Sequence, residues 1–295
     1  MKTARIEVEL YVDATPERVF AALFDTEALR AWFAESAEVS AAERHYHFWG
    51  RYTPEDPSRA DGRHPIRDLK MDRHLTYDWR LRGADTRVSI SLVPEGSGTQ
   101  IQLRHDDAPA RRVEEGSLAD WWGLSLENLE AWLIRRRAGL RVDFATPPEL
   151  EIRLVAGIKA PRYEVFRALT DPDQLTRWIA EPGKVVIEPH VGGRLDFGWG
   201  EEGGPVRIVS IEPDREIAYS WKYPGEPETT VTWSLIDSGA GTDLTLMHLG
   251  FVDAVLDRPY RTGWTKFVNR LKHLVEAGPD WRMARTVAHD YEAVR

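Results

Sequence analysis

The sequence contains no cysteine among its 295 residues, and this absence removes several kinds of site at once. Disulfide bonds, zinc sites with thiolate ligands and cysteine nucleophiles all require that side chain. Positive charge is also scarce: 39 Lys and Arg stand against 48 Asp and Glu, which gives a formal net charge of −9. Because affinity for nucleic acid comes largely from cationic side chains on phosphates, no nucleic-acid partner is expected.

Long apolar runs are missing as well. No run approaches the roughly 18 apolar residues of a membrane-spanning helix, so no membrane insertion is expected. The opening residues, MKTARIE, lack the apolar core of a secretory signal, and we therefore expect a cytoplasmic location. Tryptophan, in contrast, is abundant, with 12 residues. Because its large ring carries one polar N–H, this excess suggests ligand or partner surfaces in addition to core.

The chain repeats itself. Residues 13–34 and 159–180 align without a gap and are identical at nine of 22 positions, including a Val-Phe pair and a later Trp. Residues 88–105 and 231–248 are identical at eight of 18 positions, and each block ends in a histidine. The blocks keep their order, which indicates that one domain occurs twice.

The predicted domains are residues 1–142 and residues 147–279, each of ordinary domain length. Pro147 and Pro148 mark the junction, since proline does not continue a helix. Residues 280–295 form a C-terminal tail in which apolar residues recur at every fourth position. That spacing predicts an additional helix, with an apolar face formed by Met283, Val287 and Tyr291.

Hydrophobic periodicity predicts the same order of elements in both copies. A strand with alternating apolar residues opens each copy, at residues 6–12 and 150–154, and two short helices follow it. Three alternating strands come next, and a longer amphipathic helix closes each copy. The predicted class is therefore α+β, with a curved antiparallel sheet wrapped around a long C-terminal helix, twice over. A strongly bent sheet seldom closes completely over a helix, so we expect a cavity between them.

Several motifs resemble a known family. A Val-Phe pair with a Trp downstream occurs in both copies, as Val19-Phe20 to Trp32 and as Val165-Phe166 to Trp178. The other motifs are a double glycine before an Arg-Leu-Asp-Phe run within residues 191–197, a Met-His-Leu-Gly-Phe run within residues 246–251, and the pair Gly263-Trp264 that opens the last helix. With the element order, they resemble the START-like (SRPBCC) superfamily and its helix-grip fold. More narrowly, each copy is similar to the AHSA-like domains, the family of activator of heat-shock-protein-90 ATPase homologues.

The second copy carries the fuller set of these motifs. The first copy has Glu43-Arg44 in place of the double glycine, and it carries a longer loop at residues 53–64. We therefore expect the better-formed cavity in the second copy. The resemblance implies a small apolar or aromatic molecule as its guest, and the alternation of the strands indicates which side chains face it. The predicted cavity residues are Tyr77, Trp79, His105, Trp122, Phe197, Tyr219, Trp221, Trp233, His248, Trp264 and Phe267.

Histidines are the polar residues with the most chemical potential. His105 and His248 end equivalent strands, so each is a candidate to orient a ligand or to act as a general base. A hydrogen-bonded histidine at the mouth of the core is the alternative, since no carboxylate of fixed spacing accompanies either one. His45 and His47 share one face of a predicted strand, but two imidazoles seldom make a metal site, and a solvated face is expected. We predict no catalytic residue, no metal and no cofactor.

The favoured function is non-catalytic binding of a small hydrophobic or aromatic ligand between the sheet and the long helix. One alternative is an enzyme of the cyclase, aromatase or hydrolase type that acts on such a ligand, with His105 or His248 as its base. Another is an interaction module of the co-chaperone type, which predicts an exposed apolar patch. No residue pattern supports a chaperone partner, so the expected partner is a small apolar or aromatic molecule.

Overall fold

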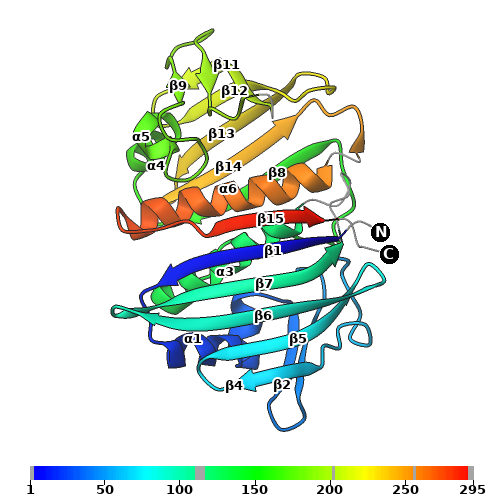
Figure 1. Cartoon of the computed structure of the whole chain (residues 1–295). Helices are drawn as coiled ribbons and strands as arrows, with labels where there is room; N and C mark the ends of the chain where they lie inside the picture. Colours follow the sequence, from blue (N-terminus) through cyan, green and yellow to red (C-terminus); the bar gives the residue numbers. More distant parts are fainter. Residues whose placement is uncertain (1–2, 110–116, 201–202, 255–256, 292–295) are drawn as a thin grey trace. The chain divides into compact units, whose positions relative to one another are not determined.

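A computed structural model shows the fold in four ranges of the chain: 3–109, 117–200, 203–254 and 257–291. Its contacts divide the chain into two compact units, residues 1–147 with 284–295 and residues 148–283, which we call copy one and copy two. Each unit has an antiparallel sheet, two short helices after its first strand and a long helix, as the sequence predicts (Figure 1). The predicted fold class is confirmed.

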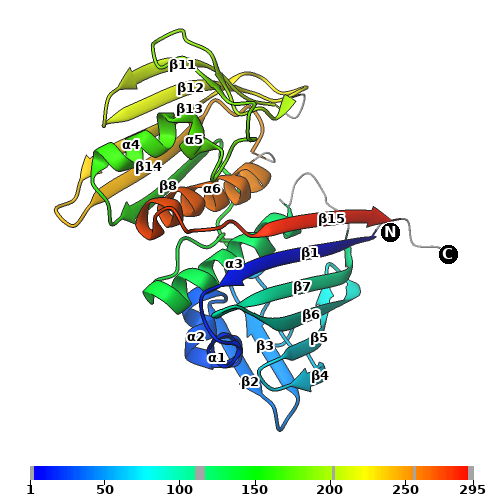
Figure 2. The ribbon, with the colours of Figure 1, turned by 60° about the vertical axis from the view of Figure 1, so that its left-hand side comes forward.

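Copy one contains β1 (Thr3–Val12), α1 (Pro16–Leu23), α2 (Thr26–Trp32), β2 (Ser36–Ser40), β3 (His45–Trp49), β4 (Ile66–Lys70), β5 (His74–Leu81), β6 (Ala84–Glu95), β7 (Gly98–Pro109), α3 (Leu118–Arg135) and β15 (Arg285–Tyr291). Six strands pair in the order β15-β1-β7-β6-β5-β4, and β2 pairs with β3 in a separate ribbon. The three helices lie on one face of the six-stranded sheet (Figure 2). Alternate residues of β1 are buried there, as its period of two predicts.

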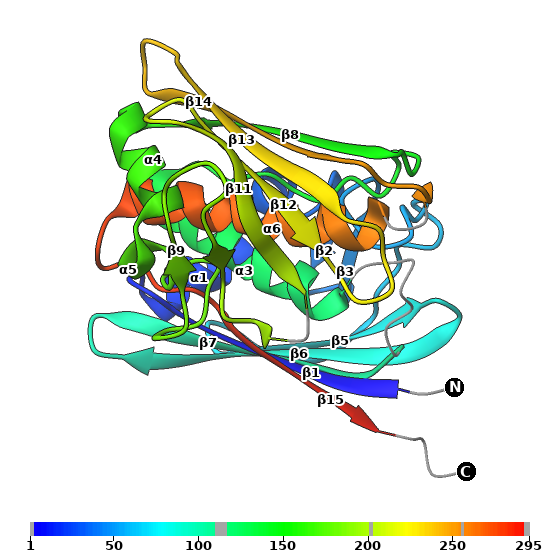
Figure 3. The ribbon, with the colours of Figure 1, turned by 90° about the horizontal axis from the view of Figure 1, so that it is seen from above.

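Copy two contains β8 (Glu151–Ile158), α4 (Arg162–Thr170), α5 (Pro172–Leu175), β9 (Val186–Ile187), β10 (Leu195–Asp196), β11 (Gly204–Glu212), β12 (Glu216–Lys222), β13 (Thr229–Asp237), β14 (Thr242–Leu249) and α6 (Asp257–Ala277). Its main sheet has the order β11-β12-β13-β14-β8. The long helix α6 runs along this sheet on the same side as α4 and α5 (Figure 3). Within the described ranges, no helix of the chain combines the length and the apolar character that crossing a membrane requires.

Equivalent tryptophans fix the short helices of the two copies in the same way. In copy one the indole Nε1 of Trp32 donates to the backbone oxygen of Ala22 at 3.0 Å. In copy two Trp178 donates to the backbone oxygen of Ala168 at 2.9 Å. Both rings are almost fully buried, so each indole combines apolar packing with one satisfied polar group. The sequence repeat thus extends to individual hydrogen bonds.

The C-terminal tail is a strand, which corrects the predicted helix. β15 pairs antiparallel with β1 over seven residue pairs, from Thr3 opposite Tyr291 to Glu9 opposite Arg285. The apolar spacing of four that suggested a helix fits a strand equally well, because residues four apart share a face in both. The deciding factor is the edge of β1, whose backbone N–H and C=O groups need partners that a nearby extended segment supplies.

Two contacts with α3 complete the attachment of β15. Glu127 is fully buried, and its Oε1 accepts the backbone N–H of Ala284 at 3.0 Å, just before the strand begins. Gly123 leaves space for Thr286, because a Cβ on residue 123 would lie 3.0 Å from the Thr286 hydroxyl oxygen. The tail therefore belongs structurally to copy one, although copy two precedes it in the sequence.

Removing β15 is expected to weaken copy one. A chain ending at Met283 loses seven cross-strand pairs, which predicts a loss of about 2–4 kcal/mol in the unfolding free energy of copy one. It also leaves the β1 edge open to pairing between chains. Urea unfolding and size-exclusion chromatography measure the two effects. A chain ending at Tyr291 keeps the whole strand and is the control. Equal stability of the two truncated chains would contradict the prediction.

Candidate functional site

The predicted cavity residues gather in the core of each copy, between the sheet and the long helix. In copy one, Tyr77, Trp79, His105 and Trp122 are all buried. In copy two the corresponding side chains pack ring against ring, and only Phe267 among the seven predicted there is partly exposed. The seven are Phe197, Tyr219, Trp221, Trp233, His248, Trp264 and Phe267.

In copy one, His105 is the centre of a buried hydrogen-bond network. Its Nδ1 accepts the indole N–H of Trp122, from α3, at 3.1 Å. Its Nε2 lies 2.7 Å from the hydroxyl of Thr86 in β6, and that hydroxyl donates to the backbone oxygen of Trp79 at 2.6 Å. The Trp79 ring stacks on the imidazole, with ring centroids 5.4 Å apart. The network therefore joins three neighbouring strands, β5, β6 and β7, to the long helix α3.

Copy two contains the same network at equivalent positions. The indole of Trp264 in α6 donates to His248 Nδ1 at 2.9 Å. The Thr229 hydroxyl lies 2.7 Å from His248 Nε2, and it donates to the backbone oxygen of Trp221 at 3.4 Å. Both copies keep all four side chains of the network, so the network is a structural feature that the two domains share.

The network leaves neither histidine a free lone pair. An indole N–H only donates, so Nδ1 must be the unprotonated nitrogen and Nε2 must carry the hydrogen. Each threonine then accepts from Nε2 and donates to the tryptophan carbonyl, so every partner is satisfied. Burial lowers the pKa of His105 and of His248 to about 3, and both stay neutral near pH 7. As arranged here, neither residue can take up a proton without losing a hydrogen bond.

The threonines of this network are the functional neighbours that the sequence analysis missed. Thr86 and Thr229 lie two residues before the second repeated block, at equivalent positions in β6 and β13. Extending the alignment by two residues would have paired them. Their role would still have been hidden, since it depends on strand register and on the fold of the opposing helix.

His45 and His47 hold structural positions. Their rings stack with centroids 4.4 Å apart on a partly exposed face of β3, and His47 Nδ1 accepts the backbone N–H of His64 at 2.9 Å. Burial is the largest cause that lowers the pKa of His47. Among the residues that the structure describes, no group of three or more His, Asp or Glu side chains is arranged to hold a metal ion.

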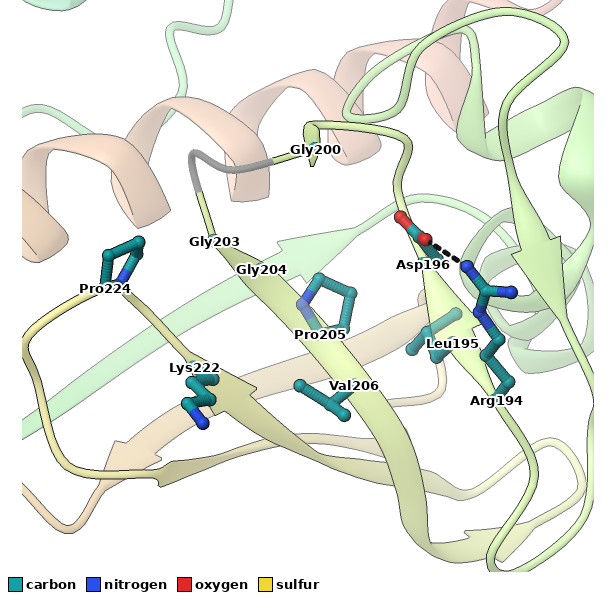
Figure 4. Close-up of a pocket in the computed structure, with 10 residues that line it drawn as sticks. All are labelled: Arg194, Leu195, Asp196, Gly200, Gly203, Gly204, Pro205, Val206, Lys222 and Pro224. Atoms are coloured by element: carbon teal, nitrogen blue, oxygen red, sulfur yellow. Dashed lines mark hydrogen bonds and ion pairs between the residues drawn. The ribbon is translucent and has the colours of Figure 1, made fainter.

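An open hollow of about 390 Å³ lies on copy two, beside β10, β11 and the end of β12 (Figure 4). Leu195, Pro205, Val206 and Pro224 give it apolar walls. Lys222 and an ion pair between Arg194 and Asp196, 2.7 Å long, add charge, and Gly200, Gly203 and Gly204 complete the lining. Two further hollows, of about 390 and 520 Å³, lie on copy one and are lined mainly by polar side chains. None of the eleven predicted residues lines these three hollows of the described chain.

Trp199 lies next to Gly204, which lines this hollow, and packs against aromatic rings of copy two. A Cβ added to Gly204, which lines the hollow, would lie 3.6 Å from the Trp199 ring. The ring also stacks on Phe267 and meets Trp221 edge-on, each with centroids 5.7 Å apart. Trp199 is only partly buried, and its indole donates to the backbone oxygen of Ile179 at 3.0 Å. Trp199 is not among the residues predicted from the sequence, although a tryptophan between two glycines is an unusual pattern.

In copy one, the longer loop at residues 53–64 and the residue before it contact the aromatic core. The Trp121 indole donates to the backbone oxygen of Tyr52 at 3.1 Å, at the start of that loop. At its end, His64 packs against Phe48 and Trp79, with centroids 4.1 and 5.9 Å away. Trp121 and His64 are both buried, whereas Trp199 and Phe267 of copy two are partly exposed. The two copies therefore differ in the exposure of these rings.

Comparisons with known proteins find a matching family and several similar solved structures. The family model described as Activator of Hsp90 ATPase homolog 1-like protein matches residues 13–133 and 159–276. No curated protein matches the chain. Among solved structures, protein MLL2253 from Mesorhizobium loti is 25% identical, covers 44% of this chain and 98% of its own, and has a TM-score of 0.38. CalU16 from Micromonospora echinospora is 29% identical, covers 42% of this chain and 74% of its own, and has a TM-score of 0.37.

DynU16 is a solved structure whose match extends over both copies. DynU16, a protein in the dynemicin biosynthetic locus, covers 92% of this chain and 98% of its own at 14% identity, with a TM-score of 0.32. The family model accounts for most of copy one and most of copy two. The chain therefore belongs to the Activator of Hsp90 ATPase homolog 1-like protein family, with one family domain in each copy.

Proposed function

We propose that copy two binds a small hydrophobic or aromatic molecule without chemical conversion, in the place that the Trp199 ring occupies against Trp221 and Phe267. The observation that supports this most is the position of Trp199, which is partly exposed, lies next to a residue that lines a surface hollow, and packs against Trp221 and Phe267. A guest with an aromatic or apolar body would regain the ring contacts that the departing indole gives up.

The backbone around Trp199 suits such a movement. Gly198 and Gly200 flank it with φ values of +82° and +64°, a region that glycine adopts without steric cost. Its indole donates one hydrogen bond to Ile179, and its ring contacts include Phe197, Trp221 and Phe267. Release of the ring therefore costs one hydrogen bond and a few aromatic contacts. The guest replaces the aromatic contacts.

We propose binding without catalysis because the hydrogen bonds of the two histidine networks already occupy both candidate bases. His105 and His248 were the candidate bases of the enzyme alternative, and each already has both ring nitrogens hydrogen-bonded in a buried setting. A general base needs a lone pair directed at the substrate. Binding and release of an unchanged molecule requires no such group.

The Trp199→Ala variant tests the proposal. Calorimetric titration with lauric acid, flavone and 2-naphthol is expected to find at least one ligand of the wild-type chain. The variant should bind that ligand about two- to tenfold more tightly, because the guest no longer displaces an aromatic contact of about 0.5–1.5 kcal/mol.

The matched control is Trp132→Ala. Trp132 is also partly exposed, but it lies on α3 of copy one with Arg136 over its ring. This variant should bind the same ligand as the wild type does. The proposal is wrong if none of the three compounds binds, or if Trp199→Ala and Trp132→Ala change the affinity equally.

A further inference from the structure

An open hollow of about 520 Å³ lies on the six-stranded sheet of copy one, on the face opposite to the three helices (Figure 2). Its polar lining comes from four neighbouring strands of the sheet, β1, β7, β6 and β5. In each strand the polar residues that line the hollow alternate with buried residues that face the helices. The hollow is therefore separate from the aromatic core of this copy.

The pairing of the strands explains why the sheet is hollowed at this place. Ser89 and Ser91, on β6, are short side chains in the middle of the lining. Their neighbours on β7 are Arg104 and Gln102, and Ser91 also pairs with His74 on β5. Longer side chains thus stand on both sides of two serines, and the serine hydroxyls form the floor between them.

The floor is held by hydrogen bonds that are already in place. The Ser91 hydroxyl lies 3.0 Å from Nδ1 of His74, and the Thr76 hydroxyl lies 2.7 Å from Nε2. Thr76 is in turn 3.1 Å from the Ser89 hydroxyl. Thr76 is only 7% exposed although it lies on this outer face, so the floor is recessed. Side chains fixed before binding lose little conformational entropy when a guest arrives.

The wall of the hollow on the side of β1 and β7 carries different hydrogen-bonding groups side by side. Glu7 pairs across the strands with Arg104, and Glu9 pairs with Gln102. A carboxylate only accepts, a guanidinium only donates, and an amide does both. Side chains paired in this way lie about 5 Å apart at their Cβ atoms, so one hydroxyl group of a guest can reach both. Within the described ranges, no hydrogen bond or ion pair engages the side chains of Glu9 and Gln102.

We propose that this hollow of copy one binds a neutral sugar through neighbouring hydroxyl groups. Each sugar hydroxyl both donates and accepts, so it can donate to a carboxylate of the wall and accept from the group beside it. Ions fit less well, because a cation would meet Arg104 and an anion would meet Glu7 and Glu9. The site lies outside the aromatic core, and it is independent of the ligand proposed for copy two.

Copy two lacks the pair of groups that the sugar would use. The register of β14 on β8 places Val155 where copy one has Glu9, and Thr245 where copy one has Gln102. Val155 and Thr245 also lie directly opposite each other, as Glu9 and Gln102 do. A valine side chain neither donates nor accepts, so no sugar site is expected on this face of copy two. The two copies therefore supply a natural pair of substitutions for a test.

NMR titration of the full chain with maltose, lactose and cellobiose tests the proposal. At least one of the three should shift amide signals of β1, β5, β6 and β7 around the hollow, with a dissociation constant on the order of 1 mM, because each new hydrogen bond replaces one to water. Glu9→Val and Gln102→Thr give copy one the residues of copy two. Each should weaken the binding of that sugar by about fivefold or more.

Gln100→Thr is the matched control. Gln100 lies on the same face of β7 as Gln102 but does not line the hollow, so this variant should bind the sugar as the wild type does. Acetate and tetramethylammonium serve as charged probes and should bind more weakly than the sugar. Four results would each overturn the proposal: no shifts with any of the three sugars, shifts confined to copy two, equal losses of affinity in Gln102→Thr and Gln100→Thr, or tighter binding of a charged probe.

Discussion

Lowering the pH from 7 to 4.5 is expected to cost copy one about 5 kcal/mol of unfolding free energy, through His64 and His105. Burial lowers the pKa of each to about 3 in the folded state, against an ordinary value of 6.5. Below pH 6.5 the unfolded chain therefore binds more protons than the folded one, and stability falls with pH until about pH 3. Each histidine contributes about 2.5 kcal/mol between pH 7 and pH 4.5, at 1.36 kcal/mol per pKa unit.

His64→Leu isolates one of these contributions. The variant should lose only about half as much free energy over the same pH range, since His105 alone remains. Urea unfolding at each pH, with pulsed hydrogen exchange and mass spectrometry, assigns the unfolding transition to peptides of copy one. His190→Gln replaces an exposed histidine of copy two and should leave the pH dependence of copy one unchanged. The same pH dependence in wild type and His64→Leu would refute this account of His64.

The His248 network of copy two should behave as one coupled unit. His248→Leu leaves the buried Trp264 N–H without an acceptor, and we expect it to lower the unfolding free energy by about 2–4 kcal/mol. Trp264→Phe removes the donor and leaves Nδ1 of the histidine unpaired. The double variant removes both partners together, so it should lose about 1–3 kcal/mol less than the sum of the single variants.

A second pair of substitutions controls for the general effect of changing a buried ring. Trp178 donates to the backbone oxygen of Ala168 rather than to His248, although it is also buried in copy two. Trp178→Phe and His248→Leu should therefore add within about 0.5 kcal/mol. Urea unfolding of the single and double variants gives both coupling energies. Additive effects for His248 and Trp264 would show that the hydrogen bond contributes no coupling.

Most of the fold was predictable because its signals are local. The alternation in β1 and in β5 to β7 follows from the geometry of a strand, and the same pattern recurs in copy two. The duplication also made His105 and His248 visible as equivalent residues before their surroundings were known. The tail shows the limit of such signals, because its spacing of four satisfies a helix and a strand alike, and pairing with β1 decided between them.

The sequence alone determined the two-domain organisation, the order of elements and the inward face of each strand, since these depend on spacing within short segments. Only the tertiary structure decided what each inward side chain meets. His105 is paired with a threonine 19 residues before it and a tryptophan 17 residues after it, whereas the Tyr77 hydroxyl has no hydrogen-bond partner among the described residues. Those outcomes depend on strand register and on how a distant helix or loop packs, and periodicity carries no information about either.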